Sequence, residues 1–162
     1  MNSFLPAALA RATVEPDSRR SGRSESGGEP NDLDFITICD AYRSSGGIAR
    51  TPELAECLRA RPPLGSHRLE AMIVAGRLFS FAWNRSCWVP MFQFGPERGP
   101  LPRAAVSAVL TELAPIFDGW HLAVWFAAPN AWLRERRPLD LLDSDLDDVL
   151  ATARADCYIA QL

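Results

Sequence analysis

The chain contains no lysine, so all 17 basic residues among its 162 are arginines. It has only two histidines, His67 and His121, which lie far apart and beside no cysteine. A zinc site needs closely spaced His and Cys ligands, and this spacing excludes one. The cysteines also stand singly, which favours buried thiols in a reducing compartment over disulfides. They are Cys39, Cys57, Cys87 and Cys157.

The signatures of common enzyme classes are missing as well. The sequence has no G-x-S-x-G nucleophile motif, no P-loop and no dinucleotide-binding glycine pattern. The aspartates between residues 143 and 148 lack the glycine and the terminal glutamate of a calcium loop. These absences predict a protein that is not an enzyme and needs no cofactor.

Long apolar runs are absent too. No stretch approaches the roughly 20 apolar residues that a membrane-spanning helix needs. The first residues have no basic run before their short apolar stretch, so they do not resemble a signal peptide. We therefore expect no membrane contact and a cytoplasmic location.

Charge is spread unevenly along the chain. The net charge of −3 argues against a protein that coats nucleic acid non-specifically. Residues 34–90 nevertheless carry seven arginines against five acidic residues, whereas residues 100–162 carry five arginines against nine. A mildly basic front half and an acidic back half suit two different partners.

The pattern of apolar residues predicts a mainly α fold. Residues 1–32 are rich in Ser, Gly and charge after residue 15 and are expected to form a disordered tail. Residues 33–94 are expected to form a helix-turn-helix-like domain, with order beginning near Asp34 and helices over 52–60 and 66–76. Alternation over 78–83 and 87–94 predicts a β-hairpin, and Pro90 predicts that its second strand lies at an edge.

Residues 95–102 hold three prolines and two glycines, which is typical of a hinge. Residues 103–162 are then expected to form a small helical domain with helices over 103–114, 119–128 and 145–156. Ser144 is expected to cap the last of these helices, and Pro138 to begin a shorter one.

Three helices followed by a hairpin resemble a winged helix-turn-helix, in which the second helix of the pair lies in the DNA major groove. The outward face of residues 66–76 offers few groups that read base edges, so a helical subdomain with a solvated basic face stays an equal alternative. The candidate DNA-binding residues are Arg50, Arg59, Arg61, His67, Arg68 and Arg85.

The back half carries three motifs in a fixed order. An aromatic-x-x-Pro-Asn-x-x-Leu run ends at Leu133, a Pro-Leu-x-Leu-Leu run starts at Pro138, and a Val-Leu pair follows at Val149. Upstream, residues 90–94 read Pro-Met-Phe-Gln-Phe. Together these motifs resemble the toxin-binding antitoxin proteins of bacteria, the Xre/MbcA/ParS-like class, over about residues 78–156.

The resemblance implies a helical toxin-binding domain that covers the active site of a cognate toxin, often an NAD-consuming enzyme of the RES type. It also implies that the front half binds promoter DNA. Because operators are commonly two-fold symmetric, we expect a homo-oligomer. The candidate toxin-binding residues are Trp125, Pro129, Asn130, Trp132, Leu133, Pro138, Leu139 and Leu142.

Among these residues, Trp132, Leu133, Leu139 and Leu142 are the best candidates for an apolar interface, although a place in the core is the alternative. Arginine at position 132 or 139 is accordingly expected to abolish toxin protection and to spare the fold. A regulator without a toxin and a protein-binding adaptor without DNA contact remain the alternative functions.

The sequence departs from the family pattern between Leu133 and Pro138. The family usually has a glycine turn there, whereas this chain has Arg134-Glu135-Arg136-Arg137. The fold is expected to survive this change more readily than the toxin interface.

Overall fold

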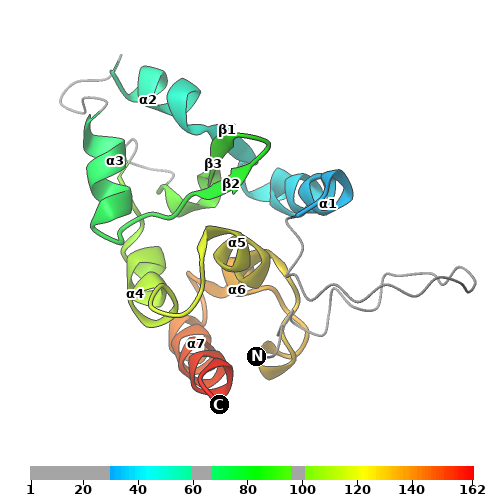
Figure 1. The fold of residues 1–162 in the computed structure, drawn as a ribbon. Coiled ribbons are helices and arrows are strands. Elements are labelled where there is room, and N and C mark those ends of the chain that lie inside the picture. Colours follow the sequence, from blue (N-terminus) through cyan, green and yellow to red (C-terminus); the bar gives the residue numbers. More distant parts are fainter. Residues whose placement is uncertain (1–29, 60–66, 96–100) are drawn as a thin grey trace, which may run out of the picture.

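The computed structural model of the protein describes residues 30–59, 67–95 and 101–162. As Figure 1 shows, these residues form α1 (Asp32–Tyr42), β1 (Ile48–Arg50), α2 (Thr51–Arg59), α3 (His67–Val74), β2 (Phe81–Trp83), β3 (Ser86–Pro90), α4 (Ala104–Leu113), α5 (Gly119–Ala127), α6 (Pro138–Leu141) and α7 (Leu146–Ala160). Short 3₁₀ turns lie at Arg43–Ser45, Met91–Gln93 and Ala131–Leu133. The expectation of a mainly helical fold is confirmed. None of the described helices is both long and apolar enough to cross a membrane.

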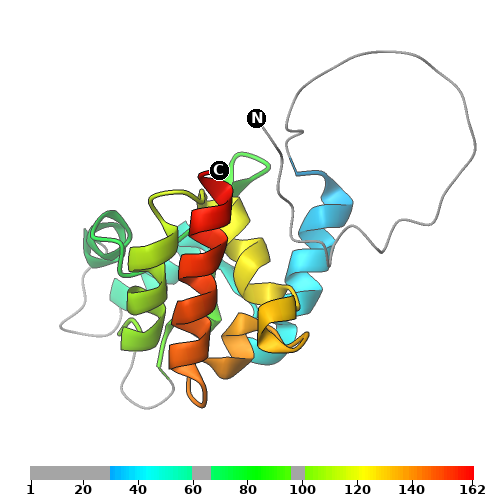
Figure 2. The same ribbon diagram turned by 90° about the horizontal axis from the view of Figure 1, so that it is seen from below.

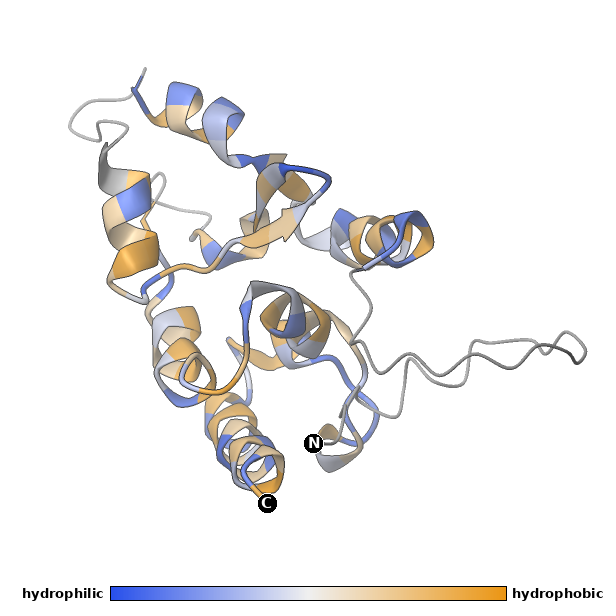
Figure 3. Ribbon diagram, viewed as in Figure 1, coloured by the Kyte–Doolittle hydropathy of each residue, from blue (hydrophilic) through white to orange (hydrophobic). Residues whose placement is uncertain are grey.

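The small sheet lies against α5, with α1 on one side of it and α2 and α3 on the other (Figure 1). From below, α4, α7, α5 and α1 follow one another across the molecule (Figure 2). Hydrophilic residues interrupt the apolar ones along α1, α2 and α7 (Figure 3), as expected of helices that bury one face, whereas α5 is apolar and buried from Leu122 to Ala127.

The helix α1 begins two residues earlier than its apolar spacing predicted, because a capping box precedes it. The Asn31 side chain accepts hydrogen bonds from the backbone N–H groups of Leu33 (2.9 Å) and Asp34 (3.1 Å). The Asp34 carboxylate in turn accepts one from the Asn31 N–H at 3.0 Å. Residues 1–29 of the predicted tail lie outside the described residues.

The sheet is antiparallel with the order β1-β3-β2, so the prediction that Pro90 confines its strand to an edge was wrong. Pro90 is the last residue of the central strand and lies opposite Ile48 in β1. The pairing with β1 needs no N–H at this position, because alternate residues form the hydrogen bonds between two antiparallel strands. The next residue, Met91, donates to the Gly47 carbonyl at 2.9 Å. The strand β1 escaped prediction because three residues are too few to show a period.

The predicted hairpin joins β2 and β3 through Asn84 and Arg85, whose φ angles are 46° and 58°. Two consecutive left-handed residues give the turn the twist that a two-residue hairpin prefers. The ring of Phe35 on α1 stacks on Trp83 of β2 with ring centroids 3.7 Å apart, and this contact holds the hairpin against α1.

A smaller core lies between α2, α3 and the sheet, and consists of Leu54, Leu58, Leu69, Met72, Leu78 and Val89. Two of the cysteines that we interpreted as buried are exposed, Cys57 on α2 and Cys87 on β3, and that interpretation was wrong for both. Neither is part of this core, although Cys57 is next to the buried Leu58 and Cys87 lies on the same face of β3 as Val89. Thr51 is the first residue of α2, and its hydroxyl donates to the Cys87 carbonyl at 3.0 Å.

The helices of the back half bury the stripes that their period predicted, namely Val106, Val109, Leu110, Leu113, Val149 and Ala153. Pro138 begins α6 as predicted. The prediction for Ser144 was wrong, because α7 begins at Leu146 with Asp145 at its cap position, and the Ser144 hydroxyl donates to the Asp145 carboxylate.

The larger core draws residues from both sides of the 95–102 segment: Ile38, Tyr42 and Phe81 come from the front, and Val109, Phe126 and Val149 from the back. The start of α5 approaches the front half closely, because a Cβ on Gly119 would lie 2.0 Å from the Ser80 carbonyl oxygen. The core therefore crosses the predicted domain boundary. The division into two domains stays a prediction, and residues 96–100 of the predicted hinge lie outside the described residues.

Gln93 has no exposed surface and joins three parts of the chain. Its side-chain oxygen accepts from the Phe79 N–H at 2.8 Å, and its amide nitrogen donates to the carbonyls of Phe79 (2.9 Å) and Pro90 (3.1 Å). Its own carbonyl accepts from the Arg103 N–H at 2.8 Å, just before α4. The side chain of Gln93, in the Pro-Met-Phe-Gln-Phe motif, thus bonds to the N–H and the carbonyl of Phe79 as a neighbouring strand would.

Candidate partner-binding site

Residues Asn130–Arg137 connect α5 to α6 and are named here the Trp132 loop. The loop is closed by hydrogen bonds from the Asn130 N–H to the Arg136 carbonyl (3.0 Å) and from the Glu135 N–H to the Asn130 carbonyl (2.9 Å). The Asn130 side chain also accepts from the Trp132 N–H at 2.9 Å. This bond fixes the position of the Trp132 backbone.

One carboxylate of α7 anchors the loop to the helices. A single oxygen of Asp156 accepts from the indole N–H of Trp125 at 2.7 Å and from the side-chain amide of Asn130 at 3.1 Å. The indole and the amide come from the end of α5 and the start of the loop. The loop is therefore rigid at its base, because hydrogen bonds to a charged acceptor are among the stronger ones.

The far end of the loop turns through two left-handed residues, Arg134 with φ 56° and Glu135 with φ 61°. Both residues lie in the segment between Leu133 and Pro138, where the antitoxins that the sequence resembles usually have a glycine turn. A side chain in this conformation costs about 1–2 kcal/mol, which glycine avoids.

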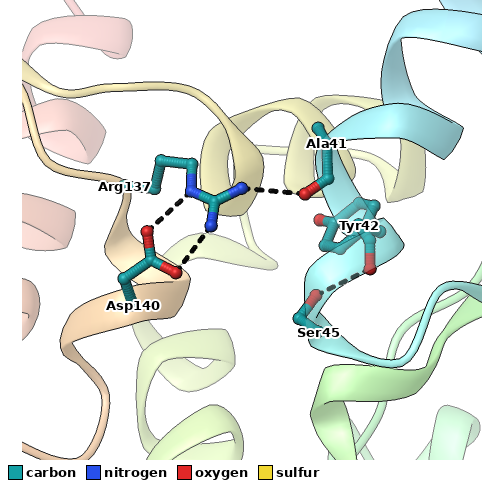
Figure 4. A network of polar contacts seen from close by, with 5 residues as sticks. All are labelled: Ala41, Tyr42, Ser45, Arg137 and Asp140. Carbon is teal, nitrogen blue, oxygen red and sulfur yellow. Dashed lines mark hydrogen bonds and ion pairs between the residues drawn. The ribbon is translucent and has the colours of Figure 1, made fainter.

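Arg137 connects the loop to α1 (Figure 4). Its guanidinium donates to both carboxylate oxygens of Asp140, at 2.6 and 2.7 Å, and to the Ala41 carbonyl at 2.8 Å. The hydrogen bonds to Asp140 raise the pKa of Arg137. The next residue of α1, Tyr42, is fully buried and donates to the Ala123 carbonyl at 2.7 Å, while its own carbonyl accepts from the Ser45 hydroxyl. Burial raises the pKa of Tyr42 well above 10.0, so its phenol is neutral.

The structure divides the eight candidate toxin-binding residues into two groups. Pro129 is exposed, Asn130 is half-buried and the side chain of Trp132 is 69% exposed. The others are buried in the core of the chain itself: Trp125, Leu133, Pro138, Leu139 and Leu142. Toxin binding by any of them stays a prediction, but only the first group offers a surface that a rigid partner can reach.

The expectation that arginine at position 139 spares the fold was wrong, because Leu139 is only 7% exposed and packs in the larger core. A charge at that position would lose its hydration without gaining a partner. The apolar stripe of a core helix and the apolar face of an interface have the same period, so spacing alone could not separate them.

Three of the candidate DNA-binding arginines have described side chains, and all three are exposed. Arg50 ends β1, and its guanidinium carbon lies 5.1 Å from the centroid of the Trp88 ring. Arg59 ends α2 and pairs with Glu56 at 2.6 Å. Arg85 occupies the turn of the hairpin.

The other three candidates are not placed in full. Arg61 lies outside the described residues. His67 and Arg68 belong to the first turn of α3, but their side chains lie outside the described part of the chain. The structure therefore brings no complete DNA-binding set together.

Sequence reasoning missed Asp156 and Gln93. Both act through hydrogen bonds to groups that are 14 to 31 residues away in the sequence. No local pattern marks such contacts. For Gln93, the one available signal was the Pro-Met-Phe-Gln-Phe motif, and this motif did not indicate what the glutamine side chain bonds to.

Comparison with known protein families, with curated proteins and with solved structures found no match for this chain. Among the described residues, no three His, Cys, Asp or Glu side chains lie together as metal ligands would.

Proposed function

We propose that the chain is an antitoxin-like protein, which binds and neutralises a cognate protein toxin through the Trp132 loop and does no chemistry itself. One observation carries the proposal: a tryptophan side chain is 69% exposed on a loop that is held rigid by Asn130 and Asp156. The motifs around this loop occur in the order typical of the antitoxins that the sequence resembles, and this order supports a toxin as the partner. The RES-type NAD-consuming enzymes are the candidate class of toxin.

Tryptophan is enriched among the few residues that dominate the binding energy of protein interfaces. An exposed ring also binds best when it loses little conformational freedom, because ordering costs subtract from affinity. The Trp132 loop meets this condition, since its backbone is hydrogen-bonded at both ends. The aromatic ring itself has no described hydrogen-bond partner, so its removal leaves the fold in place.

We expect Trp132→Ala to abolish protection in cells that co-express the chain with the product of the reading frame adjacent to its gene. Loss of a central tryptophan weakens binding by about 30-fold or more. Growth of the co-expressing cells is the readout, and thermal denaturation checks that the variant is folded.

Tyr158→Ala is the matched control, because Tyr158 is a similarly exposed aromatic residue (66%) on α7. It should protect like the wild type. Undiminished protection by Trp132→Ala would remove the interface assignment, and an adjacent product that does not harm cells would remove the antitoxin proposal.

Promoter binding by the front half is the second candidate function. It is supported by the order of the elements, since α2 and α3 precede the β2–β3 hairpin, and by the exposed Arg85 in the turn of that hairpin. The same feature supports the alternative of a regulator without a toxin. No observation on the described residues bears on the expected homo-oligomer.

A gel shift with the DNA upstream of the gene should show binding that weakens steeply with salt, because phosphate contacts release counterions. Arg85→Ala should lower the affinity, whereas Arg43→Ala, which removes an exposed arginine just after α1, should not. Binding that is absent at low salt would favour the adaptor without DNA contact.

A further inference from the structure

The Trp132 loop has a second exposed feature beside its tryptophan. Arg134 and Glu135 both bear side chains in a backbone conformation that strains any residue except glycine. Strain of this kind clusters at functional sites, where a side chain that lowers the stability of the fold contributes to binding. Either Arg134 or Glu135 is therefore a candidate contact residue.

The ion pairs of the loop single out Arg134. Arg137 is engaged by Asp140 and by the Ala41 carbonyl, and Arg136 lies 3.4 Å from Asp145. In contrast, no described acidic side chain lies within ion-pairing distance of the exposed Arg134. One residue, Leu133, separates it from Trp132, and both lie on the same closed loop.

The residues from Ala131 to Arg137 include three arginines and one glutamate, in a half of the chain that is otherwise acidic. Since Arg136 and Arg137 are paired with Asp145 and Asp140, a partner that receives the Trp132 ring meets the guanidinium of Arg134 as the positive charge beside it. Because Arg134 presents a planar fork of donors, a carboxylate is its best complement at a protein interface.

We infer that the surface that binds the Trp132 loop is an apolar pocket for the Trp132 ring with a carboxylate at its rim, and that this carboxylate pairs with Arg134. The inference rests on the proposed function for the existence of the partner and adds the chemistry of its surface. Arg134 is a specificity-determining residue, and it lies at a position where glycine would make the fold more stable.

Arg134→Gly tests this inference because its two effects have opposite signs. Relief of the left-handed strain should raise the melting temperature by about 2–4 °C. Loss of the charged contact should weaken binding of the purified adjacent gene product about tenfold, measured by calorimetry at 50 mM salt. The difference between the variant and the wild type should shrink as salt is raised, because an exposed ion pair is screened.

Glu135→Gly is the matched control, since it relieves the same strain at the neighbouring residue. It should raise the melting temperature by a similar amount and leave the affinity unchanged or slightly higher. Arg134→Lys keeps the charge but not the fork of donors, so its affinity at low salt should lie between those of the wild type and Arg134→Gly.

An Arg134→Gly variant that binds as tightly as the wild type overturns the inference. If Trp132→Ala still loses binding in that case, the proposed function stands without it. If neither variant loses binding, both fail.

Discussion

Gly119→Ala is expected to lower the stability of the protein by about 3 kcal/mol, which corresponds to a fall of about 10 °C in melting temperature. The added methyl carbon would lie 2.0 Å from the Ser80 carbonyl oxygen and 3.1 Å from the Phe81 Cα. Both atoms belong to backbone, so no side-chain rotation removes the clash. The start of α5 must move away from β2, and the core that joins the two halves must open with it.

Gly95→Ala is the control for this prediction. A methyl group there meets no atom within 4 Å, and its φ lies outside the left-handed region. It should therefore melt within about 2 °C of the wild type. Thermal denaturation followed by circular dichroism measures both variants. Equal melting temperatures for the two would contradict the close approach of α5 to the sheet.

Gln93→Leu should cost about 3 kcal/mol, although leucine has nearly the same volume as glutamine. The substitution leaves the N–H and the carbonyl of Phe79 without their side-chain partner, together with one bond to the Pro90 carbonyl. Buried polar groups that lose a partner cost about 1–3 kcal/mol each. The total is expected to be smaller than the sum of three such costs, because the backbone groups can shift and bond to water.

Urea denaturation measures this loss, and Met91→Leu in the same 3₁₀ turn is the control. Met91 is half-buried and carries no side-chain hydrogen bond, so a swap of similar volume should cost less than about 1.5 kcal/mol. If Gln93→Leu costs no more than Met91→Leu, Gln93 does not hold Phe79 in place.

The parts of the fold that the sequence predicted are those governed by local periodicity. Val106, Val109, Leu110 and Leu113 repeat at helical spacing, and all four are buried in α4. The central place of β3 could not be predicted, because it depends on pairing with β1, a strand of three residues that lies far from it in the sequence.

The candidate site was predicted in part for a related reason. The sequence indicated Asn130 and Trp132, and the structure places both on one closed loop. It could not show that Leu133 and Leu139 face inward, since a core stripe and a docking stripe have the same spacing. Nor could it indicate Asp156, whose two hydrogen bonds depend on how α7 packs beside α5.

Hydrogen exchange with and without the adjacent gene product tests most directly whether the Trp132 loop is the surface that binds a protein. The hydrogen-bonded amides of this surface loop exchange when the loop opens locally, and a partner that covers the loop makes that opening rarer. The proposal predicts that the amides of residues 131–136 exchange more slowly in the complex, while those of α2 and α3 are unchanged. Protection confined to α1, the hairpin or α3, with residues 131–136 as fast as in the free protein, would contradict it.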